Sequence, residues 1–222
     1  MNIRASNLCK DYSSGTERIQ ALRNVSLEIE PGEFLALAGP SGSGKSTLLN
    51  LLGGLDRPDE GKIFFGDQLV SEYSAQQLAL LRLWHVGFIF QNFNLIPILN
   101  VLENVEYVMM LQGLPQAERK ERSLAILADV GLKDYAGRKS NDLSGGQQQR
   151  VAVARAIVSR PNIVLADEPT ANLDSKTAVA LLDLMADLNR THKITFLFSS
   201  HDPLVLHRAH RVLNLHDGEL LD

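Results

Sequence analysis

The chain has 222 residues, which is enough for one large domain or a core with an inserted lobe, but too few for two independent enzymes. Its formal net charge of -4 argues against a protein that holds nucleic acid through non-specific attraction to phosphate. Cys9 is the only cysteine, which excludes an internal disulfide and a cysteine-based metal cluster. No stretch reaches the ~20 apolar residues that are needed to span a bilayer, so a membrane role would need a partner.

Alternating apolar and polar residues at positions 3–8 and 22–29 predict two antiparallel strands with one wet face, separated by a turn at residues 13–15. Tyr12 comes just before this turn. An aromatic ring at a strand end can stack on an adenine base, and the alternative is an ordinary surface or half-buried tyrosine. The residues around Tyr12 favour the ordinary tyrosine when they are considered alone.

A glycine-rich loop between an apolar run at 34–38 and a helical run from residue 47 matches G-x-x-x-x-G-K-S/T. Its glycines let consecutive backbone N–H groups surround a phosphate, and the following helix adds its positive end. Lys45 would reach the β- and γ-phosphates, and Ser46 offers a hard oxygen to Mg²⁺. The alternative is a glycine-rich turn with a chance lysine. The predicted phosphate-binding residues are Gly39, Pro40, Ser41, Gly42, Ser43, Gly44, Lys45, Ser46 and Thr47.

The rest of the chain alternates predicted strands and helices around a helical insertion at about residues 92–140, in which Pro115 is expected at a first helical position. This order predicts a parallel α/β sheet with helices on both faces, and we expect every site motif at the carboxyl end of a strand. The predicted elements after the loop are a helix to about 52, a strand at 62–65, a helix at 75–84, a strand at 86–90 ending at Gln91, helices at 100–112, 116–130 and 146–159, a strand at 163–166, a helix at 176–189 and strands at 194–198 and 212–215.

Two acidic residues, Asp167 and Glu168, follow the apolar strand predicted at 163–166. A phosphate loop needs a downstream acid at a strand tip to hold Mg²⁺ and its waters, and Asp167 supplies one. Glu168 then becomes the residue that polarises the attacking water. The alternative is an ordinary pair of surface acids after a strand.

A second anion site is predicted at the run Leu-Ser-Gly-Gly-Gln, residues 143–147, directly ahead of a helix. Because the first loop already surrounds the phosphates from one side, the second site of one chain would cover the γ-phosphate bound by another chain in a head-to-tail pair. The alternative is a capped helix that begins with a serine. The predicted residues of this second site are Ser144, Gly145, Gly146 and Gln147.

These motifs together resemble the ATP-binding subunit of an ABC transporter, nearly end to end. The resemblance implies a RecA-like P-loop NTPase core with an N-terminal antiparallel β-subdomain at 1–91 and 141–222, and an inserted α-helical subdomain at 92–140. It also implies ATP and Mg²⁺ as cofactors. The residues implied to act in catalysis are Glu168, His201, Gln91 and Lys45. The residues implied to bind the metal are Ser46, Gln91 and Asp167. Tyr12, Asp174 and the residues of the two anion sites are implied to make further contacts with the nucleotide.

Stretches at 87–97, 102–105 and 166–174 resemble the MacB, LolD and FtsE group of this family. The resemblance implies a homodimer that binds ATP and a peripheral position on the cytoplasmic face of the cell membrane. It implies no nucleic-acid partner but an integral-membrane permease bound through the helical lobe and the Gln91 region. Phe93, Leu95, Ile96 and Pro97 form an apolar cluster just beyond Gln91. We expect part of this cluster to belong to the lobe's own core and the remainder to form a cleft that receives a short helix of the permease. The alternatives are a soluble ABC protein of the DNA-repair or ribosome-associated kind and an FtsE-like regulator that transports nothing.

Overall fold

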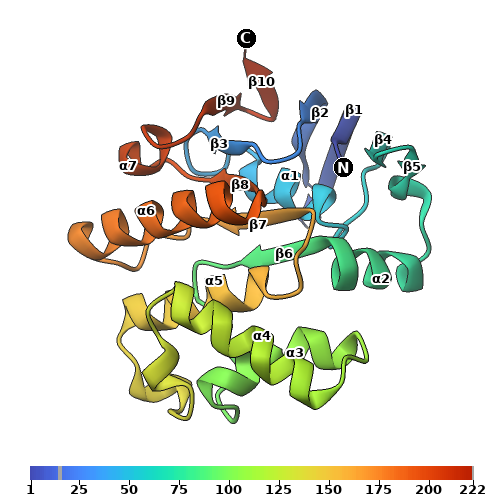
Figure 1. The fold of residues 1–222 in the computed structure, drawn as a ribbon. Helices are drawn as coiled ribbons and strands as arrows, with labels where there is room; N and C mark the ends of the chain where they lie inside the picture. The colour runs from blue at the N-terminus through green and yellow to red at the C-terminus, as the bar shows by residue number, and fades with distance from the viewer. Residues whose placement is uncertain (15–16, 222) are drawn as a thin grey trace.

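The computed structural model describes residues 1–14 and 17–221, so part of the turn expected at residues 13–15 lies outside the described residues. Within the described residues, the chain forms a six-stranded sheet and a four-stranded sheet, with a group of helices beyond the larger sheet (Figure 1). The α/β fold class is as predicted. In the same residues, no helix has both the length and the apolar character needed to cross a bilayer.

The helices lie close to their predicted positions. The prediction for Pro115 is wrong by one residue, because Pro115 lies at the N-cap position of its helix and not at the first helical position. A short helix after Asp202 is not predicted by the sequence pattern. The helices are α1 (Lys45–Leu52), α2 (Ala75–His85), α3 (Val101–Leu111), α4 (Gln116–Asp129), α5 (Gly145–Ile157), α6 (Ser175–His192) and α7 (Pro203–Leu206), with single 3-10 turns at Val70–Glu72, Lys133–Tyr135 and Ser140–Asp142.

The smaller sheet is antiparallel, as the alternation near the N-terminus predicts. Ile3 pairs with Ile29 and Ala5 pairs with Leu27; these side chains are buried, while Arg4 between them is exposed. The pairing extends beyond the predicted strands, and the short β5 is not predicted. The strand order is β2-β1-β4-β5, and the bounds are β1 (Ile3–Ser14), β2 (Glu17–Ile29), β4 (Glu60–Phe65) and β5 (Gln68–Leu69).

The larger sheet is parallel except at one edge, where β10 runs antiparallel to β9. Side chains of β3 alternate between two buried clusters: Phe34 and Ala36 face α5 and α6, and Leu35 and Leu37 face α1. Both faces of the sheet are therefore covered, as a parallel sheet requires. The strand order is β10-β9-β3-β8-β7-β6, and the bounds are β3 (Phe34–Ala38), β6 (Val86–Ile89), β7 (Ile163–Asp167), β8 (Thr195–Ser199), β9 (Arg211–His216) and β10 (Glu219–Leu221).

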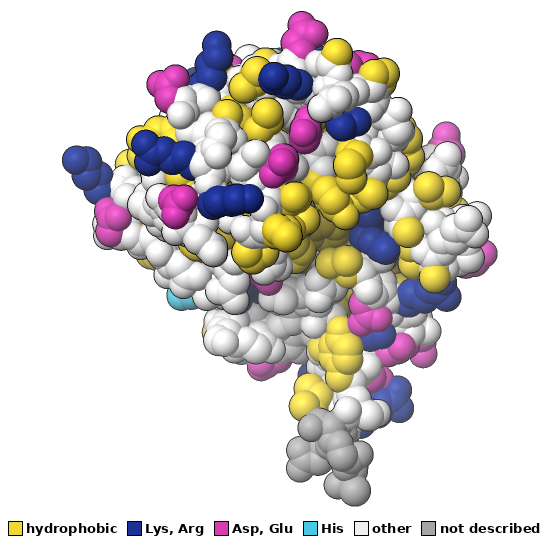
Figure 2. Space-filling model, turned by 90° about the horizontal axis from the view of Figure 1, so that it is seen from below, with side chains coloured by type: hydrophobic (Ala, Val, Ile, Leu, Met, Phe, Trp, Pro, Cys, Tyr) yellow, Lys and Arg dark blue, Asp and Glu magenta, His cyan; other side chains and the backbone are white. Residues whose placement is uncertain are grey.

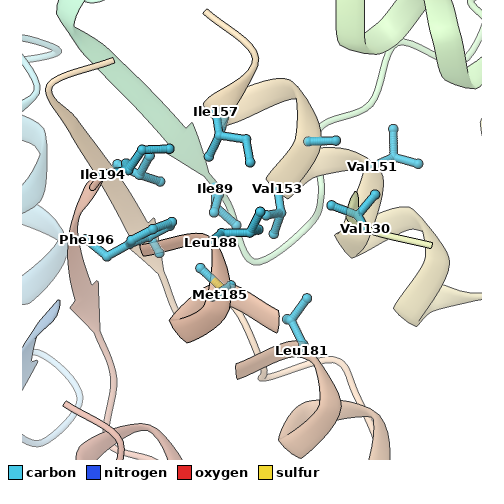
Figure 3. Close-up of a cluster of buried hydrophobic side chains, with 14 of the residues drawn as sticks. Ile89, Val130, Val151, Val153, Ile157, Leu181, Met185, Leu188, Ile194 and Phe196 are labelled. Carbon is cyan, nitrogen blue, oxygen red and sulfur yellow. The ribbon is translucent and has the colours of Figure 1, made fainter. Parts of the chain in front are cut away.

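Helix α5 joins the sheet to the group of helices formed by α3 and α4. In Figure 3, Val153 and Ile157 of α5 lie close to Ile89 of β6, and Leu188 and Met185 of α6 lie on the other side of Ile89 from Ile157. The same buried cluster continues into α3 and α4, where Met109 and Leu127 are part of it. We keep a helical subdomain at 92–140 as a proposal, and α5 packs against both that lobe and the core.

The parallel pairing brings the carboxyl ends of four strands to one edge of the sheet. The phosphate loop follows β3, Gln91 follows β6, Asp167 and Glu168 end β7, and His201 follows β8. The expectation that every motif follows a strand is wrong for the Leu-Ser-Gly-Gly-Gln run. Ser144 caps α5 and comes after a 3-10 turn instead.

A substitution at Gly87 tests how closely β6 packs against α5. A Cβ at Gly87 would lie 2.3 Å from the backbone oxygen of Ala156, whereas a Cβ at Gly137 would meet no atom within 4 Å. We expect Gly87→Ala to lower the free energy of unfolding by ~1–3 kcal/mol through overpacking, and Gly137→Ala to change it by less than ~0.5 kcal/mol. Urea denaturation of both variants measures this, and equal stabilities would contradict the close contact.

Candidate functional site

A cavity of about 600 Å³ lies at the edge where the four strands end. It gathers most of the predicted site residues in one place, although they come from distant parts of the chain. Its lining comprises Ser41, Gly42, Gly44, Lys45, Ser46 and Thr47 from the phosphate loop, Gln91, Asp167, Glu168, Ala171, Ser199 and His201 from the other strand ends, and Ile19, Gln20, Ala21, Arg23, Asp217 and Gly218 from two hairpins.

The phosphate loop has the open backbone that an anion site needs. Gly44 caps α1 with a φ of 104° and forms no side-chain cap, so the first N–H groups of α1 are left without a side-chain acceptor. A Cβ at Gly44 would lie 2.4 Å from the backbone oxygen of Ala21. A residue with a side chain would therefore push the loop away from the neighbouring hairpin, so position 44 requires glycine.

Lys45 is only 7 % exposed, and its ammonium is held by the loop itself. Its Nζ donates hydrogen bonds to the carbonyl oxygens of Gly39, at 2.8 Å, and Pro40, at 2.9 Å. A buried cation needs such partners, since burial without them would be costly. The loop therefore holds a positive charge at the cavity before any ligand binds.

Ser46 and Asp167 form a pair of hard oxygen donors. The Ser46 hydroxyl donates to Asp167 Oδ1 at 3.1 Å, although the two residues are far apart in the sequence. No cluster of three or more histidine, cysteine or acidic residues that could hold a metal alone is found in the described part of the chain. The pair fits Mg²⁺, which is usually held by one or two protein oxygens together with phosphates and water. Gln91 lines the same cavity.

Glu168 has its carboxylate fixed by two neighbours. Ser200 Oγ donates to Glu168 Oε2 at 3.1 Å, and His201 Nδ1 lies 2.8 Å from Oε1. The residue has a φ of 45°, in the left-handed region that residues with a side chain seldom adopt, and its N–H donates to the Ser199 carbonyl. Such strain is often found at functional sites. The structure thus brings the predicted acid and histidine into direct contact.

Tyr12 does not line this cavity, although its neighbour across the hairpin, Ile19, does. The Tyr12 hydroxyl donates to Asp56 Oδ2 at 2.8 Å, and the Lys10 ammonium lies 5.3 Å from the ring centroid. Burial is the main cause that raises the pKa of Tyr12, and the hydrogen bond to Asp56 also raises it, so the phenol stays neutral. Its contact with a base stays a prediction.

The second predicted anion site lies outside the cavity within one chain. Ser144 and Gln147 form a capping box at the start of α5: Ser144 Oγ accepts from the Gln147 N–H, and Gln147 Oε1 accepts from the Ser144 N–H. Asp174 caps α6 in a similar way, and hydrogen bonds from Thr177 lower the pKa of Asp174. The helix capped by a serine, which the sequence left open as the alternative, is therefore present, and none of these residues is among the described residues that line the cavity.

The structure adds contacts that the sequence pattern does not reveal. Asn172 Nδ2 donates to the Gln91 carbonyl at 2.9 Å and so joins the turns after β6 and β7. Ser200, which holds Glu168, is fully buried between β8 and His201. An Asp-Gly pair at 217 and 218 forms the turn of the hairpin between β9 and β10 and lines the cavity. This pair is a known turn signal, so the sequence alone could have predicted the hairpin.

The apolar cluster expected at residues 93–97 is placed differently from the prediction. Leu95 packs against the main buried cluster, and the Phe93 ring lies beside Gly145. A groove of about 410 Å³ does separate the lobe from the core, but none of the expected apolar residues lines it. Its lining comprises Leu55, Ala79, Arg82, Leu83, Val86, Gly87, Phe88, Phe90, Asn94, Val108, Leu111, Arg155, Ala156 and Ser159.

The site geometry agrees with comparisons against known proteins. A family model described as ABC transporter matches residues 22–171. The chain is 44% identical over 222 residues to the uncharacterized ABC transporter ATP-binding protein MJ0796 of Methanocaldococcus jannaschii, covering 98% of this chain and 94% of the relative. It is 42% identical to the ABC transporter ATP-binding protein YknY of Bacillus subtilis, covering 99% and 95%.

A dimeric structure of the MJ0796 cassette superposes with a TM-score of 0.91 at 43% identity, covering 99% of this chain and 97% of that chain. A second dimeric structure of MJ0796, in a post-hydrolysis state bound to ADP and Pi, matches with the same TM-score of 0.91 at 42% identity and the same coverage. The chain therefore belongs to the ABC transporter family, in which it is an ATPase cassette.

Proposed function

We propose that this chain hydrolyses ATP in a nucleotide-sandwich dimer and thereby powers a separate membrane permease of the MacB, LolD and FtsE type. The observation that carries the proposal is the single cavity that holds the phosphate loop, the Ser46–Asp167 pair and the Glu168–His201 pair. The chain would act as a peripheral subunit on the cytoplasmic face of the membrane.

ATP and Mg²⁺ are the cofactors of this cassette. Ser46 and Asp167, with Gln91, would hold the metal, which supplies charge neutralisation between the phosphate oxygens. Lys45 and the N–H groups at the start of α1 would bind the phosphates. These groups lie together around one cavity, and donors that are already arranged in this way need little reorganisation during the reaction.

Glu168 would orient and deprotonate the attacking water. Its Oε1 and Oε2 lie within hydrogen-bond distance of His201 and Ser200, and the His201 side chain is 71% exposed, so its ring would face a γ-phosphate bound in the cavity. His201 would then report whether that phosphate is present.

The proposed dimer is supported by the position of the second predicted anion site, which lies outside the cavity of its own chain. Ser144, Gly145, Gly146 and Gln147 lie outside the cavity of their own chain, and Asp174 does too. A second copy arranged head to tail would present these residues to the γ-phosphate. The dimeric structures of MJ0796, one of them with ADP and Pi, support this arrangement.

Substitution of the water-orienting carboxylate tests the chemistry. Glu168→Gln should retain ATP binding but slow hydrolysis by ~10²-fold or more, the range for loss of a positioned base. Lys45→Ala should weaken nucleotide binding itself, because it removes the buried charge. ATP turnover and equilibrium nucleotide binding measure the two effects. Turnover of Glu168→Gln at the parental rate would mean that another residue is the base, with His201 next to be tested.

The sandwich should assemble only while the γ-phosphate is present, because the nucleotide supplies most of the contact energy between the chains. The Glu168→Gln chain should therefore sediment as a dimer with ATP and Mg²⁺ and as a monomer with ADP and Mg²⁺. Analytical ultracentrifugation measures this. A monomer with ATP at high protein concentration would contradict the sandwich.

The groove between lobe and core supports the permease contact. Figure 2 views the molecule from the side of the helical lobe and shows hydrophobic side chains gathered around a hollow near the centre, with charged side chains around them. The groove residue Leu111 has 55% of its surface exposed and Leu55 has 47%. A short amphipathic helix of the permease would cover these side chains, which takes the place of the contact expected at Phe93 and Leu95.

A charge in this groove should uncouple the two subunits. Leu111→Glu should leave the basal ATPase activity of the isolated chain near the parental value but abolish stimulation by the permease in membrane vesicles. Leu221→Glu is the matched control, since Leu221 is equally exposed, at 55%, on β10. Normal stimulation and co-purification of Leu111→Glu with the permease would exclude this docking site.

A further inference from the structure

The turn that follows Gln91 has a strained backbone held from one side by an arginine. Phe93 and Asn94 are consecutive residues with φ of 59° and 48°, in the left-handed region that disfavours side chains. Arg155 of α5 donates one hydrogen bond to each of their carbonyl oxygens, at 2.8 Å to Phe93 and 2.5 Å to Asn94. A guanidinium has separate N–H groups in one plane, so it fixes both peptide groups together.

The two hydrogen bonds to the turn are the side-chain hydrogen bonds of Arg155 within the described residues, and its side chain also lines the groove between lobe and core. Among the described residues it forms no ion pair, and burial lowers the pKa of Arg155 from its ordinary value. A partly buried cation without a carboxylate partner depends on the carbonyl oxygens around it. The contact is therefore specific, and it joins α5 to the segment that begins at Gln91.

Helix α5 is also attached to the catalytic turn after β7. Gln149 is fully buried, and its Nε2 donates to the Pro169 carbonyl, which directly follows Glu168, at 2.8 Å. At the start of α5, the Phe93 ring lies 3.8 Å from where a Cβ on Gly145 would be. One helix therefore contacts both turns of its own cavity, while its first residues lie outside that cavity.

We propose that Arg155 is a positioning residue that makes α5 and the turn after Gln91 move as one body. The nucleotide in a chain's own cavity then determines how that chain presents Ser144 and its neighbours to the nucleotide of its partner. This inference rests on the proposed sandwich dimer. It adds a specific connection between the two ATP sites, through a side chain that contacts neither nucleotide.

A mixed-dimer experiment measures the effect of Arg155 on the partner's site. Wild-type chain is kept so dilute that it hydrolyses no measurable ATP alone, and an excess of Glu168→Gln chain is added to complete its site. We expect a Glu168→Gln/Arg155→Met chain to stimulate hydrolysis about tenfold less or worse, the scale expected when a contacting group is misplaced. Because the active chain is wild type, the hydrolysis reports on the wild-type cavity, and ATP binding by the mutant chain is measured separately to exclude a defect confined to the mutant's own cavity.

Matched variants separate positioning from stability. Arg119→Met in the Glu168→Gln chain is the control, because Arg119 is also a partly buried arginine that donates to a backbone carbonyl, that of Leu114. It should stimulate like the Glu168→Gln chain. Arg155→Lys should restore part of the stimulation, since an ammonium can still donate to the two carbonyls. ATP binding by all variants should stay within about twofold, because Arg155 lies outside the nucleotide cavity.

Three outcomes are decisive. Weak stimulation by the Arg155→Met chain with full stimulation by the Arg119→Met chain supports the inference. Equal stimulation by both overturns the role of Arg155 and leaves the sandwich dimer standing. A failure of the Glu168→Gln chain itself to stimulate would overturn the dimer and the inference that rests on it.

Discussion

The parallel pairing of β3, β6, β7 and β8 is the constraint on which the whole site depends. Each strand is short and mostly buried, and each contributes one or two chemical groups at or just beyond its carboxyl end. Because the strands are in register, a loop near residue 40, an amide at 91, acids at 167 and 168 and a histidine at 201 reach one cavity. Burial of the alternating β3 side chains in two clusters holds this edge in place, so stability and chemistry depend on the same strand.

The sequence predicts a site residue well when the role of that residue is set by its neighbours in the chain, and poorly when the role depends on a distant partner. The phosphate loop, and the acids at the end of β7, have roles set by their immediate neighbours, and they were predicted with their elements. Ser200 and Asn172 act through distant partners, Glu168 and Gln91, and no spacing in the chain reveals those contacts. The apolar residues at 93–97 were divided between the lobe's core and a docking cleft without saying which residue went where, because a loop with several apolar residues has more than one way to bury them. Here Leu95 turns inward.

The cavity of one chain gathers the residues proposed to hold the metal and the water, and the described residues of the predicted second anion site lie outside it. Ser144 is instead occupied as the cap of α5, exposed and away from the cavity. A capped helix start is stable without a ligand, so this surface needs no nucleotide to fold. Affinity between two chains can therefore come mainly from the phosphate that both contact, which is suitable for an interface that must open after each turnover.

The close approach of β6 to α5 has a mechanical consequence. Because Gly87 has no side chain, the strand touches the helix backbone at Ala156, and that end of α5 has little freedom to shift. In the proposed coupling, α5 tilts about this contact together with the turns attached to it, and Ser144 lies at the far end of the helix. With an arm of roughly 17 Å, a tilt of roughly 7° would carry Ser144 by about 2 Å, which is enough to make or break a hydrogen bond. A small rearrangement in one cavity would thus be amplified at the surface that faces the next chain.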